Sequence, residues 1–174
     1  MATATTHISV EDFHARYANE NGYEYWFGKV VRKSVPTWLH AILQSLLAEI
    51  FYEQGYYSGT ELDLRISREF QPRPDVAASL ELDSLGYTTK PIDIVAEILS
   101  PDDAIRKVLE KCQHYAELGI PQIYVFDPVE RSAAQWNRAE QQLEPITQLN
   151  LTNGSIVLVN DILVRFDQRL KRRS

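Results

Sequence analysis

Two carboxylates and one lysine have the types and the spacing that metal-dependent cleavage of phosphodiester bonds requires. Asp75 follows Pro74, twenty-one residues separate it from Glu97, and Lys111 lies in the helix-like segment that comes next. Two carboxylates can hold a hard cation such as Mg²⁺, which lowers the pKa of a bound water. A lysine can orient that water or stabilise charge on the phosphate. Asp75 and Glu97 are therefore candidate metal ligands, and Lys111 joins them as a candidate catalytic residue.

Two predicted strands bring the carboxylates together. Apolar and β-branched residues dominate positions 76–80 and 92–99, which is typical of strands. If the two strands pair antiparallel, the start of the first lies beside the end of the second, and Asp75 lies near Glu97. Side chains alternate along a strand, so Glu97 lies opposite an entirely apolar face. An acidic side chain in so apolar a strand is costly to bury unless it is paired or bound to a metal.

The helix predicted after these strands has a lysine on its apolar side. With about 100° between successive residues, the apolar side chains between positions 104 and 118 fall in an arc of roughly 180°. Lys111 is the only charged residue inside this arc, and Lys107 lies at its edge. We expect Lys111 to turn toward the sheet, where Glu97 or a bound phosphate meets its charge.

Each candidate also has a structural interpretation. An aspartate in the position of Asp75 is typical of a turn that enters a strand. Lys111 can form an ion pair with Glu97 without taking part in catalysis. Ser100 is typical of a helix cap, and His40 of an ordinary surface or core position on a helix. The residue types alone leave these alternatives open.

The order of predicted elements indicates an α/β fold. The elements are a strand pair over residues 23–31 broken at Gly28, a helix from Ser34 to Gly55, strands over 62–66, 76–80 and 92–99, a helix from Ser100 to Gly119, and a strand over 122–126. The second helix begins with a capping serine, a proline and the acids Asp102 and Asp103, which favour a helix N-terminus. Strand, helix and strand in this order predict a parallel βαβ unit.

The last third of the chain predicts short strands and turns that complete the sheet, among them residues 156–159 and 162–166. No repeat, low-complexity tract or flexible linker divides the sequence. The whole chain, residues 1–174, is therefore predicted to be one domain.

The motifs resemble those of the PD-(D/E)XK nuclease superfamily, which has the restriction-endonuclease-like fold, and more closely those of a large bacterial endonuclease family within it. The matching residues are Tyr23-Glu24, Gly28, His40, Pro74-Asp75, Glu97-Ile98-Leu99-Ser100-Pro101, Lys111, Tyr115, Gly119 and Asp127-Pro128, so the resemblance covers a core from about residue 20 to 130. It implies a mixed sheet flanked by helices, with an N-terminal β-hairpin and helix and a C-terminal β extension. It also implies an endonuclease with Mg²⁺ or Mn²⁺ held by Asp75, Glu97 and the carbonyl of Ile98.

Two positions depart from the resembled motifs. The superfamily lysine would fall at Leu99, so the resemblance implies that Lys111 has taken over its role. Lys29 stands where the family often carries a glutamate after Gly28. The second change keeps an alternative function open, a non-catalytic module that retains the fold and serves binding or assembly. Hydrolysis of another phosphoester is a further alternative.

The composition indicates which partners and which cellular compartment to expect. The net charge of −6 argues against a dedicated nucleic-acid binder, because Lys and Arg dominate phosphate affinity. The basic groups of a nuclease can be local, so this charge is compatible with cleavage of DNA. No apolar run approaches the ~20 residues of a membrane span, the first residues lack the apolar core of a signal peptide, and Cys112 is the single cysteine. We expect a cytoplasmic protein with no membrane partner.

A homodimer is expected as well. Cleavage of both strands of a duplex calls for two active sites, and a symmetric dimer is the commonest way to provide them. The chain has nine Tyr and three Trp, more aromatic surface than so small a core readily covers.

Overall fold

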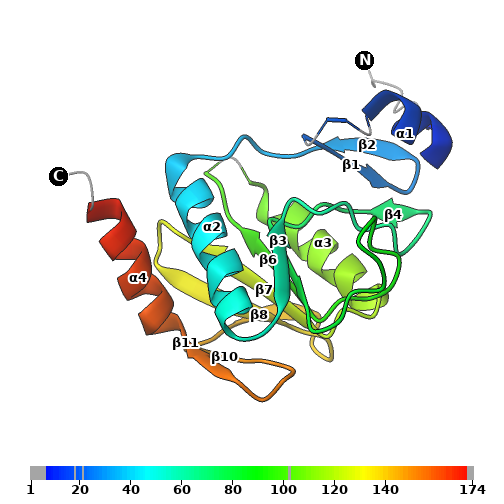
Figure 1. The fold of residues 1–174 in the computed structure, drawn as a ribbon. Coiled ribbons are helices and arrows are strands. Elements are labelled where there is room, and N and C mark those ends of the chain that lie inside the picture. Colours follow the sequence, from blue (N-terminus) through cyan, green and yellow to red (C-terminus); the bar gives the residue numbers. More distant parts are fainter. Residues whose placement is uncertain (1–6, 18, 21, 102, 172–174) are drawn as a thin grey trace.

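A six-stranded mixed sheet forms the centre of the computed structural model, which describes residues 7–17, 19–20, 22–101 and 103–171 (Figure 1). The strands lie in the order β3 (Tyr57–Thr60), β5 (Val76–Ser79), β6 (Ile94–Ile98), β7 (Gln122–Asp127), β8 (Ser132–Asn137) and β9 (Gln142–Pro145). Strands β6 and β7 are parallel, and every other neighbouring pair is antiparallel. The predicted α/β class and the parallel βαβ unit are confirmed.

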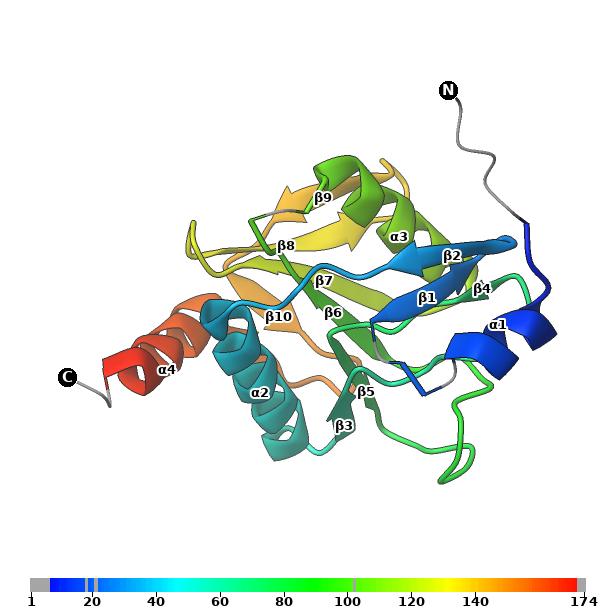
Figure 2. The same cartoon turned by 90° about the horizontal axis from the view of Figure 1, so that it is seen from above.

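Helices cover both faces of this sheet (Figure 2). Helix α2 (Trp38–Glu53) and helix α4 (Val159–Lys171) share one apolar core with the sheet, and helix α3 (Ile105–Glu117) packs on the other face. Strand β6 serves both cores because its side chains alternate: Ile94 lies in the first core and Val95 in the second. No helix in the described ranges is both long and apolar enough to cross a membrane.

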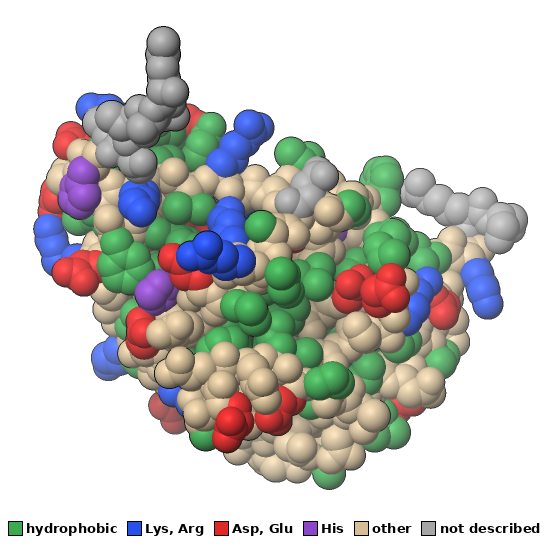
Figure 3. Space-filling view, turned by 180° about the vertical axis from the view of Figure 1, so that it is seen from behind, with side chains coloured by type: hydrophobic (Ala, Val, Ile, Leu, Met, Phe, Trp, Pro, Cys, Tyr) green, Lys and Arg blue, Asp and Glu red, His purple; other side chains and the backbone are tan. Residues whose placement is uncertain are grey.

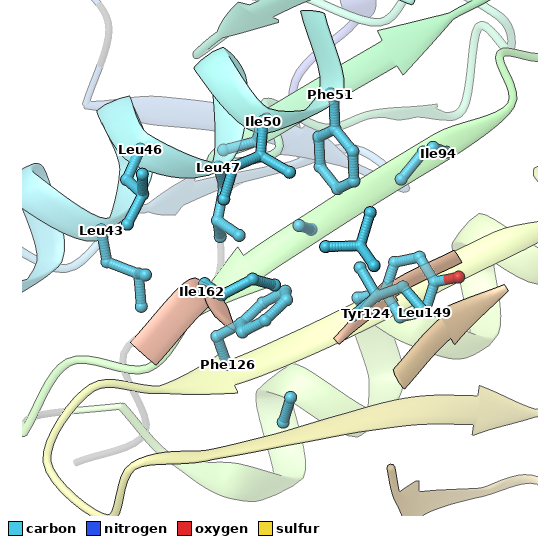
Figure 4. Close-up of a cluster of buried hydrophobic side chains, with 14 of the residues drawn as sticks. Leu43, Leu46, Leu47, Ile50, Phe51, Ile94, Tyr124, Phe126, Leu149 and Ile162 are labelled. Carbon is cyan, nitrogen blue, oxygen red and sulfur yellow. The ribbon is translucent and has the colours of Figure 1, made fainter. Parts of the chain in front are cut away.

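The core beneath α2 is built from a leucine-rich helix face. Figure 4 shows the side chains of α2 pointing toward β6, β7 and α4, with Phe51 near Ile94 and Ile162 near Phe126. Leu46, Leu47 and Phe51 are fully buried. The spacing of these residues matches one side of a helix. Their packing therefore fixes the position of the first turn of α2, which lies next to the start of β5 and the end of β6.

An N-terminal hairpin lies over the α3 side of the molecule. Helix α1 (Val10–Tyr17) packs on β1 (Tyr23–Trp26), which pairs with β2 (Lys29–Arg32) and with the short β4 (Phe70–Gln71). Phe27 and Gly28 connect the hairpin with positive φ angles of 48° and 79°, as a two-residue hairpin turn requires. The predicted strand pair broken at Gly28 is confirmed.

The C-terminal prediction needs a correction. Strands β10 (Gln148–Asn150) and β11 (Ile156–Leu158) form a separate two-stranded sheet, and the following residues are helical. The predicted strand over 162–166 was wrong, because Val159, Ile162 and Phe166 recur at helical spacing and are all buried against α2. The C-terminal β extension thus adds β8 and β9 to the sheet and then ends in a helix.

Other elements also differ from the prediction. Helix α2 begins at Trp38 rather than at Ser34, with Thr37 as its cap, and ends at Glu53. The strand predicted over 62–66 is absent among the described residues there, since only Leu64 forms an isolated bridge, to Thr88, and the strand lies earlier as β3. Helix α3 begins at Ile105 rather than Ser100. The backbone N–H of Ser100 donates to the Asp103 carboxylate over 2.6 Å, which forms a turn instead of a helix start. Asp102 lies outside the described residues.

Candidate active site

Asp75 is buried at the start of β5. The register pairs Val76 with Ala96, so Asp75 and Glu97 meet at the same end of the strand pair. The Ile98 N–H donates to Asp75 Oδ2 over 2.7 Å. This bond ties the aspartate to the strand that carries Glu97, and both residues line one cavity of about 50 Å³. The predicted meeting of the two carboxylates at one site is confirmed.

Glu97 lies on the α3 side of β6, where Lys111 meets it. Lys111 Nζ is 2.8 Å from Glu97 Oε1, and the Tyr115 hydroxyl donates to the same oxygen over 2.6 Å. Lys111 is only 6% exposed, so it turns toward the sheet as its place on the helix predicts. Its closest carboxylate partners are Glu97 and a second glutamate, Glu24, rather than Asp75.

The position of Glu24 was not anticipated as part of the site. Its carboxylate lies 2.8 Å from Lys111 Nζ and accepts hydrogen bonds from the backbone of Arg73 and the indole of Trp26. Glu24 is 1% exposed. The sequence shows Glu24 only as part of the Tyr23-Glu24 motif, because no local pattern predicts that the hairpin folds over α3.

Lys33 is a further cation at the site that sequence reasoning missed. Its ammonium lies 2.5 Å from Glu61 Oε2, 2.8 Å from the Arg73 carbonyl and 3.2 Å from Asp75 Oδ1. Gln44 on α2 donates to Glu61 and to the Asp75 carbonyl. The linker after β2 and helix α2 therefore both help to hold the start of β5.

His40 is buried at the site rather than placed in an ordinary surface or core position. The Thr37 side chain caps α2 by accepting from the His40 N–H, which sets the histidine in the first turn. His40 Nε2 lies 3.4 Å from Asp75 Oδ1, and Nδ1 lies 3.1 Å from the Ser100 hydroxyl. Ser100 is thus a partner of His40 and not a helix cap.

The two central carboxyl groups have opposite pKa shifts. Burial acts to raise the pKa of Asp75, but the hydrogen bond from His40 and the charge of Lys33 hold it well below its usual range. Burial raises the pKa of Glu97 to about 7, since the charge of Lys111 only partly opposes burial and the charge of Asp75. At neutral pH Asp75 is ionised and Glu97 is poised between two protonation states. Such separated pKa values are typical of functional sites.

The lysines stay charged next to these acids. Burial acts to lower the pKa of Lys111, but the charges of Glu24 and Glu97 raise it above its ordinary value. Burial likewise acts to lower the pKa of Lys33. The charge of Asp75 outweighs this effect, so the pKa of Lys33 is also raised above its ordinary value. The site therefore combines ionisable carboxylates with permanent cations in one cavity.

The donor set fits a hydrated hard cation. Asp75 and Glu97 line the cavity together with Ile98, and no group of three or more His, Cys, Asp or Glu among the described residues forms a ready-made metal cage. Mg²⁺ keeps several of its waters and is usually bound by one or two carboxylates. Two carboxylates beside an open cavity match that preference better than a closed site for a softer metal.

The two departures from the resembled motifs lie in different places. Leu99 lines the same cavity as Glu97 and Lys111. Lys29 is exposed at the start of β2 and is not among the cavity residues. The change at position 29 therefore leaves the cavity unaltered, whereas the missing lysine at position 99 concerns it directly.

The likeness to a solved structure with a TM-score of 0.76 supports the fold. A structure described as a "putative nuclease belonging to DUF820 from Anabaena variabilis ATCC 29413" superposes with a TM-score of 0.76 at 20% identity, covering 91% of this chain and 99% of that one. A DrdV–DNA complex matches with a TM-score of 0.41 at 18% identity, over 90% of this chain and 12% of that one. None of the curated proteins compared with the chain is similar to it.

The family assignment rests on a match that spans most of the chain. The model of the Uma2 family, whose description is "Putative restriction endonuclease", matches residues 10–166. The resemblance to the restriction-endonuclease-like superfamily and the fold class are thereby confirmed. The chain belongs to the Uma2 family.

Proposed function

We propose that the protein is a Mg²⁺- or Mn²⁺-dependent endonuclease that hydrolyses phosphodiester bonds of DNA. The observation that carries this proposal is the convergence of Asp75, Glu97 and Lys111 on one cavity from three different elements. Buried acids with separated pKa values beside a buried lysine are costly to maintain. Their placement in a cavity open to solvent favours a catalytic role over a structural one.

Asp75 and Glu97 would hold the cation, with the carbonyl of Ile98 as a third ligand. A cation bound there supplies a water of lowered pKa and neutralises charge on the phosphate. Asp75 is suited to this task because it is ionised at neutral pH. The pKa of Glu97 is raised to about 7 without a cation, and a cation bound there would favour its ionised form.

Lys111 would act on the phosphate or on the attacking water. Its ammonium has three donors, and Glu97 and Glu24 account for two of them. The remaining donor suits an oxygen of the scissile phosphate. Because the lysine is held by two carboxylates and by the packing of α3, it needs no reorganisation as charge develops, which is what electrostatic catalysis requires.

DNA is the proposed substrate, which the description of the Uma2 family supports. The net charge is −6, but Figure 3 shows several Lys and Arg side chains in the upper part of the face opposite that of Figure 1, with acidic and apolar side chains between them. Single cations of this kind can contact phosphates despite the overall charge. A homodimer would supply a second site for the other strand, and the cytoplasm remains the expected compartment because Cys112 is the single cysteine.

A non-catalytic binding module is the second candidate. It is favoured by the ion pairs that already neutralise the site, since Lys33 contacts Asp75 and Lys111 contacts Glu97 within the same chain. In that case the cavity would be a stabilised remnant of an active site. The exposure of Lys29 removes one argument for this candidate.

A cleavage assay separates the two candidates. Supercoiled plasmid, linear duplex and single-stranded DNA would be incubated with wild type and Glu97→Gln in the presence of Mg²⁺ or Mn²⁺. Glu110→Gln, on the exposed side of α3, is the matched control for loss of one carboxylate. We expect metal-dependent cleavage by wild type and the control, and a loss of roughly a hundredfold or more in Glu97→Gln.

The same assay with RNA and simple phosphodiesters tests the breadth of the substrate class. A wild-type protein that cleaves none of these substrates with either metal, while it remains folded, would favour the non-catalytic module. Cleavage that is equal in wild type and Glu97→Gln would point to a contaminating nuclease.

A further inference from the structure

An apolar groove that is separate from the catalytic cavity lies beside β3. It has a volume of about 600 Å³ and runs between the end of α2, strand β3 and the loop over residues 82–88. Figure 2 shows β3 at the edge of the sheet, with the loop that follows β5 projecting beyond it. Six large apolar side chains line the groove and are exposed: Tyr52, Tyr57, Leu62, Leu82, Leu85 and Tyr87.

The exposed apolar area approaches what one partner of a stable complex presents. Leu85 is 97% exposed, Tyr52 71% and Tyr57 58%, and the other three side chains are 42–53% exposed. Taking about 150–200 Å² for each fully exposed large side chain, these fractions correspond to roughly 550–730 Å² per chain. Standard interfaces bury about 800 Å² per partner, and apolar patches above a few hundred Å² mark interaction sites.

The groove follows a free sheet edge. Strand β3 pairs only with β5 among the described strands. No backbone hydrogen bond from another described segment reaches the other edge of residues 57–60. Such an edge is a template for pairing with another strand, and a two-fold axis would let two copies of β3 pair with each other.

The charges of the groove suit a protein and not a nucleic acid. The charged side chains that line it are Glu61 and Asp63, with no Lys or Arg among the lining residues. Glu61 is paired with Lys33, and Asp63 with Arg65 over 2.9 Å. Because each of these two carboxylates has a partner in its own chain, the lining residues of two copies would bring no unpaired like charges together. The cation nearest to the lining, Arg65, lies over the Tyr87 ring and is already paired with Asp63, which makes the groove a poor site for phosphates.

We propose that this groove is the interface of a two-fold symmetric homodimer. In such a dimer Leu85, which is 97% exposed on the loop beside the groove, would enter the groove of the second copy. Glu61 lines the groove and also holds Lys33 at the catalytic cavity. The interface therefore adjoins the site, although its existence does not depend on the proposed nuclease activity.

The test is the mass of the full chain in solution. Sedimentation equilibrium between about 1 and 100 µM should give a dimer for wild type, since interfaces of this size commonly reach micromolar affinity or better. Leu85→Glu and Tyr57→Glu should each weaken the dimer by more than tenfold. Both side chains are exposed, so neither change should affect folding, which circular dichroism would verify.

Ile156→Glu is the matched control, because Ile156 is 60% exposed on β11 and does not line the groove. This variant should remain as dimeric as wild type. A wild type that is monomeric up to 100 µM would overturn the proposal. So would a dimer that Leu85→Glu and Tyr57→Glu leave unchanged, because the interface would then lie on another surface. Neither readout uses DNA cleavage, so failure of the dimer is distinguishable from failure of the proposed activity.

Discussion

Lys111 on α3 and Glu97 on β6 form an ion pair of 2.8 Å in a part of the protein where both are almost completely buried. Glu24 from the N-terminal hairpin joins the same ammonium. One lysine thus connects three elements that are distant in the sequence, and it lines the same cavity as the aspartate proposed to bind the metal.

Removal of Lys111 should therefore reduce stability as well as activity. Lys111→Ala leaves two buried carboxylates without their cation, which should lower the free energy of unfolding by roughly 3–5 kcal/mol. Urea denaturation measures this change. Lys107→Ala is the control, since Lys107 is half-buried and donates to the Arg32 carbonyl, and it should cost only about 1 kcal/mol. Equal stability of Lys111→Ala and wild type would show that the ion pair is not formed in solution.

Loss of activity in Lys111→Ala does not by itself distinguish catalysis from instability. The double variant Leu99→Lys with Lys111→Ala does, because Leu99 lines the same cavity and stands where the superfamily lysine would fall. A lysine there should restore part of the cleavage. A folded but inactive double variant, together with an active Lys111→Ala, would argue against a catalytic lysine at position 111.

Metal affinity should depend on pH through Glu97. The pKa of this group is raised to about 7, so below that pH a proton competes with the cation for the carboxylate. The affinity for Mn²⁺ should fall by up to roughly tenfold per pH unit below 7 and level off above it. Asp75 itself does not change its protonation in this range, because its pKa lies well below its usual value. Its partner His40 adds to the loss of affinity at low pH, because the pKa of His40 is raised by the hydrogen bond and the charge of Asp75 although burial acts to lower it. Titrations from pH 5.5 to 8 with constant affinity would contradict the assignment of Glu97 as a ligand.

Lys33 should oppose metal binding at Asp75. Its ammonium lies 3.2 Å from Asp75 Oδ1, and a permanent cation at that distance repels a second one. Lys33→Met should therefore bind Mn²⁺ severalfold more tightly than wild type. Lys29→Met, on the exposed hairpin, should leave the affinity unchanged. Weaker binding in Lys33→Met would mean that Lys33 supports the geometry of Asp75 more than it competes with the metal.

Local patterns in the sequence predicted the central residues of the site well. The alternation of side chains along the strand predicted that Glu97 points away from the apolar face of β6. The helical periodicity predicted that Lys111 points toward the sheet. Both patterns depend only on neighbours within a few residues, so the sequence reveals them directly. The antiparallel pairing of β5 and β6 then brought Asp75 to the same end. The first two inferences used only periods of two and 3.6 residues, whereas the antiparallel pairing was an assumption that the structure bears out.

The remaining site residues depend on contacts between distant parts of the chain. Glu24 and Lys33 reach the cavity because the N-terminal hairpin and its linker fold over α3 and β5, which no local pattern reveals. The strand predicted at 162–166 failed for a related reason. A run of five residues is too short to distinguish a strand from a helix by its pattern. The segment is helical because this conformation packs Phe166 into the core beneath α2.

Calorimetric titration of the metal-free protein with Mn²⁺ tests the central claim most directly, because it measures joint binding by Asp75 and Glu97 without any substrate. We predict one cation per chain for wild type, and a loss of binding in Asp75→Asn and in Glu97→Gln. Glu110→Gln, which removes a carboxylate from the exposed face of α3, should bind like wild type. Unchanged affinity and stoichiometry in either Asp75→Asn or Glu97→Gln would contradict the claim that the two carboxylates share one cation.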